Sequence, residues 1–147
     1  MKTNKFEEFY EIHSNLEAAF EEATAEKDEK RIEACKKCYQ ILIERVRSHG
    51  QAFGDIMQDY IDSRKKGNDL LDFRNLNDED RVPEIVSELR RNGIEEFTFS
   101  SRWSSSVEVA WAFQQAGCTL SGMKVVCTDT GNVFVKPEHS PAFLFRV

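Results

Sequence analysis

The chain has 147 residues, 31% of them charged, and a formal net charge of -6, and this composition excludes several classes of protein. Its 40% of hydrophobic residues can fill a packed core, which excludes general disorder. No run of about 18 apolar residues is present, so we expect no membrane-spanning helix. The first residues turn acidic before the apolar stretch of a secretory signal could form, and we therefore expect a cytoplasmic protein.

Two amphipathic helices are predicted at the start of the chain. Residues 4–24 place apolar side chains at steps of three and four, with Glu between them. Asp28 is a suitable N-cap for a second helix, whose apolar positions form a heptad-like seam from Ile32 to Tyr60. These helices predict a long helical hairpin within a region of residues 1–67. Gly50 and Gly54 leave open whether the second helix is continuous.

Residues 68–147 are predicted to form a separate α/β module. A polar linker over 68–77 precedes a helix that is capped by Asn77 or Asp78 and ends at Gly93. The apolar period then changes from 3.6 to 2, which predicts strands at 94–99, 120–128, 133–135 and 142–147, with a turn at 129–132. A further helix begins at a capping box of Ser105 and Glu108 and ends at Gly117. The expected fold class is therefore α+β, with a small β-α-β-β-β unit whose strand-helix-strand part makes a right-handed parallel crossover.

Part of this module resembles a known group of proteins. The stretch from Leu89 to Ser106, then Trp111-Ala112-Phe113 and Gly117, and the closing Pro141 to Arg146, are similar to a module in small uncharacterised bacterial proteins of phages and conjugative elements. That resemblance implies a genomic setting. It implies no reaction, cofactor or site residue, because the group has no assigned activity.

The residues that often carry chemistry have simpler interpretations. Cys35 and Cys38 have the spacing of a zinc knuckle, but they lie within a predicted helix, and Cys118 and Cys127 are too far apart to complete the site. We expect four reduced cysteines that form no disulfide. His13 and His49 occupy helical seams, and no acid-His-Ser spacing identifies a catalytic triad. We therefore expect a protein that is not an enzyme and that needs no metal or cofactor.

The loop from Ser100 to Ser106 is the first candidate binding site. It follows a strand and opens a helix, where free N–H groups and the helix dipole favour anions. The loop lacks the glycines of a phosphate-binding loop, and the capping box already accounts for part of its serine content. A small anion or nucleotide would be bound by Ser101, Arg102, Ser104 and Ser105.

An acidic display surface is the second candidate and the leading hypothesis. Residues 1–92 hold 21 acids and 16 bases, so this region carries most of the negative charge. Such a balance disfavours nucleic-acid binding and favours a protein partner with a basic surface. The residues expected to contact that partner are Glu7, Glu8, Glu11, Glu17, Glu21, Glu22, Glu26 and the loop residue Trp103.

We expect Trp111, in contrast, to lie in the core. The hypothesis describes an accessory protein, in its narrowest form a mobile-element inhibitor of a host nucleic-acid-binding factor such as a CRISPR effector. A solvated helix face is the simpler interpretation of the glutamate row. Self-association through the helical seam is a third possibility.

Overall fold

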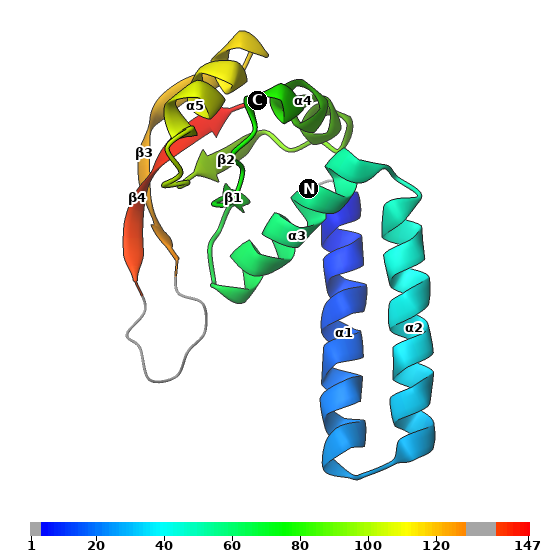
Figure 1. Ribbon diagram of the computed structural model, residues 1–147. Helices are drawn as coiled ribbons and strands as arrows, with labels where there is room; N and C mark the ends of the chain where they lie inside the picture. Colours follow the sequence, from blue (N-terminus) through cyan, green and yellow to red (C-terminus); the bar gives the residue numbers. More distant parts are fainter. Residues whose placement is uncertain (1–3, 129–137) are drawn as a thin grey trace. The chain divides into compact units, whose positions relative to one another are not determined.

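The computed structural model describes residues 4–128 and 138–147, and it confirms the predicted α+β class (Figure 1). Three helices come first in the chain, and a four-stranded mixed sheet with further helices follows. Contacts divide the chain into two compact units, Met1–Met57 and Gln58–Val147. The division falls inside the third helix, earlier than the boundary after residue 67 that the sequence suggested.

The first unit contains the predicted helical hairpin, formed by α1 (Lys5–Ala25) and α2 (Glu29–Arg47). Both helices are capped by side chains, and Asp28 is the N-cap that the sequence predicts for the second. The side chain of Asn4 accepts a hydrogen bond from the Glu7 N–H at 2.8 Å, and that of Asp28 accepts one from the Arg31 N–H at 3.2 Å. The seam is closed within one chain, because its residues Phe9, Ala23, Cys35 and Leu42 are buried.

Aromatic contacts close the end of the hairpin where α3 (Gln51–Lys65) begins. The rings of Phe6 and Phe53 stack with centroids 4.6 Å apart, and both side chains are buried. Phe9 meets Phe53 edge-on at 5.7 Å, and the His49 ring lies 4.6 Å from that of Phe53. Aromatic pairs in this geometry add stability beyond their buried area. The first turn of α3 is thereby held against α1.

The predicted second helix is interrupted, and the break lies at Gly50. The helix α2 ends at Arg47, and Gly50 has a φ of +97°, which lies in the left-handed region that favours glycine. Gly54, in contrast, lies inside α3 with its N–H bonded to the carbonyl of Gly50 at 3.2 Å. The sequence therefore marked the region of the break, and the backbone conformation identifies which glycine makes it.

Alanine substitution should separate the roles of these two glycines. Gly50→Ala should lower the free energy of unfolding by about 1 kcal/mol, because a Cβ is strained at positive φ even where space is open. Gly54→Ala should raise it by about 0.5–1 kcal/mol, because alanine favours the helix and no atom lies within 4 Å of the added Cβ. Urea unfolding of both variants measures these changes. Equal effects of the same sign would contradict the assignment.

The second unit is built on a sheet of β1 (Asp72–Phe73), β2 (Glu96–Phe99), β3 (Thr119–Cys127) and β4 (His139–Arg146) in the order β1-β2-β4-β3. β4 is antiparallel to both β2 and β3, so β2 and β3 run in the same direction, as the crossover prediction requires. They are not neighbours, however, because β4 lies between them. β1 falls in the predicted linker and was missed, since two residues show no periodicity. The predicted turn at 129–132 and strand at 133–135 lie outside the described residues.

Helices of the second unit cover an aromatic face of this sheet. The helix α5 (Ser106–Gln115) places Phe113 within 4.7 Å of Phe97 and 5.4 Å of Phe145, measured between ring centroids. The 3-10 helix η1 (Glu79–Arg81) leads into α4 (Val82–Arg91), which begins after the Asp78 cap. Its predicted stripe is confirmed, since the following side chains are all buried: Val82, Ile85, Val86 and Leu89.

A buried polar cluster occupies the opposite face of the sheet and joins β1 to β2. The Asp72 side chain accepts hydrogen bonds from the Thr98 hydroxyl at 2.7 Å and the Ser100 hydroxyl at 2.6 Å. The Asp72 N–H donates to the Ser63 hydroxyl oxygen at 2.9 Å. All four residues are buried, so each bond forms in a region where water cannot replace it. Asp72 therefore fixes the short β1 strand in place.

Removal of this carboxyl group should destabilise the second unit. Asp72→Ala leaves two buried hydroxyl groups without their acceptor, and we expect a loss of about 3 kcal/mol in the free energy of unfolding. Asp69→Ala is the matched control, because the Asp69 side chain is 83% exposed and should contribute less than about 0.5 kcal/mol. Urea denaturation provides the comparison. An Asp72→Ala loss no larger than that of the control would show that the cluster is not structural.

Candidate functional site

The acidic face lies on α1 and is centred on the side of the helix away from its buried residues. Residues 6–26 contain seven Glu and no Lys or Arg. An α-helix advances about 100° per residue, so these glutamates spread over an arc centred away from Phe6, Phe9 and Ala23, the buried residues of α1. The helix thus has one apolar side and one side that carries only negative charge.

Ion pairs within the first unit divide the predicted glutamates into two groups. Arg31 of α2 lies 3.5 Å from Glu22 and 2.8 Å from Glu26, and His13 lies 3.9 Å from Glu17. Glu7 lies beside the Asn4 cap and is half-buried. The side chains of the remaining three, which form no ion pair or hydrogen bond in the described ranges, are exposed: Glu8, Glu11 and Glu21.

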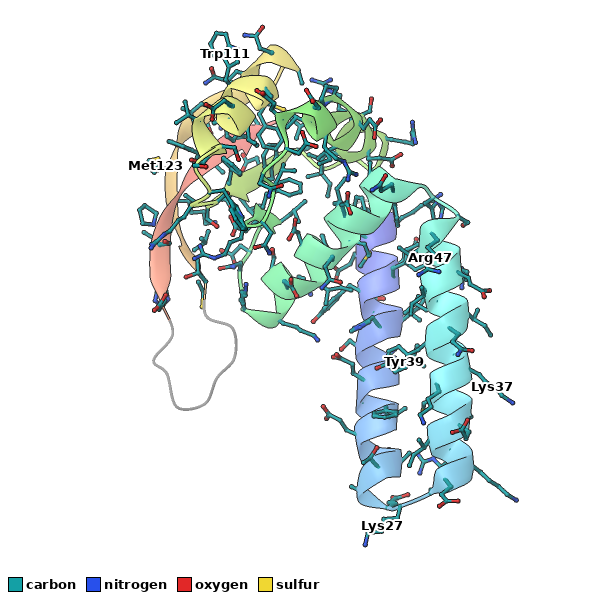
Figure 2. The ribbon with its side chains drawn as sticks, in the orientation of Figure 1. Lys27, Lys37, Tyr39, Arg47, Trp111 and Met123 are labelled. Atoms are coloured by element: carbon teal, nitrogen blue, oxygen red, sulfur yellow. The ribbon has the colours of Figure 1, made fainter. Side chains whose placement is uncertain are left out.

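Positive charge on α2 limits the acidic surface to a single helix. Residues 29–47 contain six Lys and Arg against three Glu, and Figure 2 shows Lys37 extending away from the hairpin seam. The two helices of the hairpin thus carry opposite net charge. The count of acids and bases over residues 1–92 does not show this difference between the helices. The negative charge of α1 also acts on α2 across the seam. The pKa of Tyr39 is raised, first by burial and second by the charge of Glu17.

Two tryptophans of the second unit are exposed. Trp103, the predicted contact residue, is 54% exposed in the loop before α5. Trp111 was expected in the core, and that prediction is wrong, because its side chain is 60% exposed. The buried side of α5 is formed by Val109 and Phe113. Trp111 is two residues from each of these, which turns it about 200° away from them on the helix.

The Ser100–Ser106 loop uses much of its hydrogen-bonding capacity within the chain. Arg102 donates from Nη2 to the hydroxyl oxygen of the buried Ser140 at 2.5 Å. The Ser101 hydroxyl oxygen accepts from the Trp103 N–H at 3.3 Å. The predicted capping box is absent, because the Ser105 hydroxyl donates to the carbonyl of Asn77 at 2.8 Å instead of capping α5.

Carboxyl groups also surround this loop. Ser104 and Ser105 line a shallow cavity of about 420 Å³ whose other walls carry four acidic residues: Asp78, Glu79, Asp80 and Glu108. An anion placed there would be repelled by these side chains. The geometry favours a structural role for the loop over an anion site.

The cysteines and histidines are dispersed. All four cysteines are free thiols, with Cys35 buried in the seam and Cys38 exposed on α2. Burial raises the pKa of the Cys118 thiol, which disfavours the thiolate needed to bind a metal or attack a substrate. Within residues 4–128 and 138–147, no group of three or more His, Cys, Asp or Glu side chains could hold a metal ion.

A second cavity of about 420 Å³ lies between the sheet and the segment that joins α3 to β1. Lys66, Thr98 and Val126 are among its lining residues. Asp69 and Lys124 also line it, and they form an ion pair at 3.5 Å, so their charges offset each other. Sequence reasoning missed this cavity because it treated residues 68–77 as a linker and could not place them against the sheet.

Comparisons with known proteins identify the second unit. In the described part of the chain, no helix is long and apolar enough to cross a membrane. No curated protein and no solved structure matches the chain. One family model matches residues 55–147, which include most of α3, the sheet and its covering helices, and it is described as a domain of unknown function, DUF7698. The chain therefore belongs to the DUF7698 family.

Proposed function

We propose that the protein is a non-enzymatic accessory protein whose acidic α1 face binds a second protein with a basic surface. The observation that supports this most is the continuous face of α1 with seven Glu and no Lys or Arg between residues 6 and 26. A face of one charge sign steers an oppositely charged partner and repels nucleic acid. The basic α2 beside it restricts the partner to the α1 side.

Glu8, Glu11 and Glu21 are the main contact residues in this proposal. Their side chains are exposed and form no ion pair or hydrogen bond within the described residues, so a partner's Lys and Arg can reach them without breaking an existing ion pair. Glu22 and Glu26 already pair with Arg31 and contribute less. Trp103 belongs to the other unit, and we assign it no part in the α1 surface.

In its narrower form, the proposal names a nucleic-acid-binding protein as the partner. A groove that binds a phosphate backbone is lined by Lys and Arg, and carboxylates spaced along a helix can occupy the same positions as phosphates. The protein would then act in the cytoplasm as an inhibitor of that factor. The resemblance of its C-terminal part to phage and conjugative-element proteins motivates a host defence factor, such as a CRISPR effector, as the target.

Charge-neutral substitution of the exposed glutamates should weaken partner binding. The triple variant Glu8→Gln, Glu11→Gln and Glu21→Gln removes three contacts worth about 0.5 kcal/mol each, so we expect about a tenfold loss of affinity. Immobilised protein would capture the partner from a bacterial lysate at increasing KCl concentrations, and the captured protein would then be titrated against each variant. Binding by the parent protein should weaken steadily as salt rises.

The matched control is Glu44→Gln, Glu84→Gln and Glu95→Gln. It changes the net charge from -6 to -3, as the test variant does, and each triple contains one acid from the first turn of a helix, Glu8 or Glu84. The control should keep parental affinity. A partner that binds equally well at high salt, or equal losses for both triples, would refute the proposal.

A further inference from the structure

The strand β3 forms an open edge of the sheet (Figure 1). It is the longest strand of the described residues, yet Val126 is the only one of its nine residues that is buried. β4 covers one side of β3, and no described strand pairs with the other side. An unpaired edge presents main-chain N–H and C=O groups that can accept another strand.

Asn68 shows which main-chain groups face the open edge. Its side-chain Nδ2 donates to the Cys127 carbonyl at 3.0 Å, and its Oδ1 accepts from the Cys127 N–H at 2.9 Å. Cys127 therefore directs both groups away from β4. Directions alternate along an antiparallel strand, so Val125 and Met123 direct their N–H and C=O groups to the same edge. Within residues 4–128 and 138–147, no hydrogen bond is made to the main-chain groups that Val125 and Met123 direct to this edge.

The side chains along this edge are apolar and exposed. Val125 is 63% exposed and Met123 is 57% exposed, and Figure 2 shows Met123 projecting outward beside the sheet. Met123 lies opposite Phe143 of β4, which is itself 37% exposed and extends the apolar row across the sheet. Contiguous exposed apolar side chains on an edge strand mark a surface that another strand can cover.

The edge lacks the usual protection against strand pairing. Natural edge strands carry charges, prolines or strong bulges that prevent association. Lys124 is the only charged residue of β3, and it is ion-paired with Asp69 at 3.5 Å. The bulge lies between Leu120 and Gly122, at the start of the strand, and leaves the segment from Gly122 onward in regular register.

We propose that β3 pairs in antiparallel orientation with β3 of a second copy of this chain, which joins the two sheets into one. A two-fold pairing of identical strands is self-complementary. When Met123 lies opposite its own copy, Lys124 faces Gly122 instead of the other Lys124, so like charges are kept apart. Asn68 limits the paired segment, because it already occupies the edge at Cys127.

A short edge contact buries little surface, so the dimer should be weak and should depend on concentration. Light scattering after size-exclusion chromatography should give the parent a mass that rises from 17.0 kDa toward twice that value. Met123→Lys places two like charges opposite each other and should remain a monomer. Ile41→Lys is the matched control, because Ile41 is also 57% exposed but lies on α2. It should dimerise as the parent does.

Circular dichroism would confirm that Met123→Lys is folded. A parent mass of 17.0 kDa at every attainable concentration overturns the proposal. The strand that pairs with this edge would then have to come from a different protein. A dimer of Met123→Lys, or loss of the dimer in Ile41→Lys, overturns it as well. None of these outcomes bears on the α1 surface, because the pairing uses no residue of α1.

Cross-linking tests the register directly. In a background with the exposed Cys38 changed to Ser, Met123→Cys should form a disulfide-linked dimer under mild oxidation. Directly opposite hydrogen-bonded residues have Cα atoms about 5.5 Å apart, within the range that a disulfide spans. Val107→Cys, at a position that is 75% exposed on α5, should give no cross-link. A dimer that is linked through Val107→Cys and not through Met123→Cys overturns the β3 interface.

Discussion

The packing of Phe113 against the sheet is the interaction on which the second unit depends. Its ring lies within 6 Å of four sheet phenylalanines, at 5.9 Å from Phe73, 4.7 Å from Phe97, 5.8 Å from Phe99 and 5.4 Å from Phe145. Each of these side chains is almost fully buried. One helix therefore joins three strands that are distant in the sequence, and the aromatic face becomes the core.

That choice of face fixes the environment of every other side chain in the sheet, because neighbours along a strand point to opposite sides. Phe97 and Phe99 enter the core, so Thr98 must point the other way, where Asp72 accepts a hydrogen bond from the Thr98 hydroxyl. The same alternation places Phe143 and Met123 on the aromatic side. The Phe143 ring meets that of Phe145 at 6.4 Å, at the margin of the aromatic cluster, and both Phe143 and Met123 remain exposed. The choice of the sheet face that packs against α5 thus produces both the buried polar cluster and the apolar edge.

In the first unit, burial of one side of a helix likewise determines where the charged side chains lie. The seam selects which side of α1 is buried, and the glutamates occupy the remaining arc. Because Arg31 reaches across to Glu22 and Glu26, part of the acidic row stabilises the hairpin, whereas the side chains of Glu8, Glu11 and Glu21 remain exposed. A basic helix beside an acidic one also gives the hairpin two sides of opposite net charge.

The sequence by itself determined the local elements of this protein. Asn4 and Asp28 cap the first two helices, the stripe of α4 is buried, and glycines end helices where the chain needs positive φ. These features depend on neighbours within a few residues, so periodicity and capping preferences predict them. The acidic arc of α1 follows from the same periodicity.

Only the tertiary structure decided the features that depend on distant residues. The two-residue strand β1 is held by hydrogen bonds that the Thr98 and Ser100 hydroxyls donate to the Asp72 carboxylate, and no local pattern predicts it. Ser105 bonds to Asn77 rather than capping its own helix, and Trp111 faces outward because α5 needs only Val109 and Phe113 to cover the sheet. The open edge of β3 exists because β4 lies between it and β2. A linear sequence does not contain that strand order, since it is set by which long-range pairings bury the aromatic face.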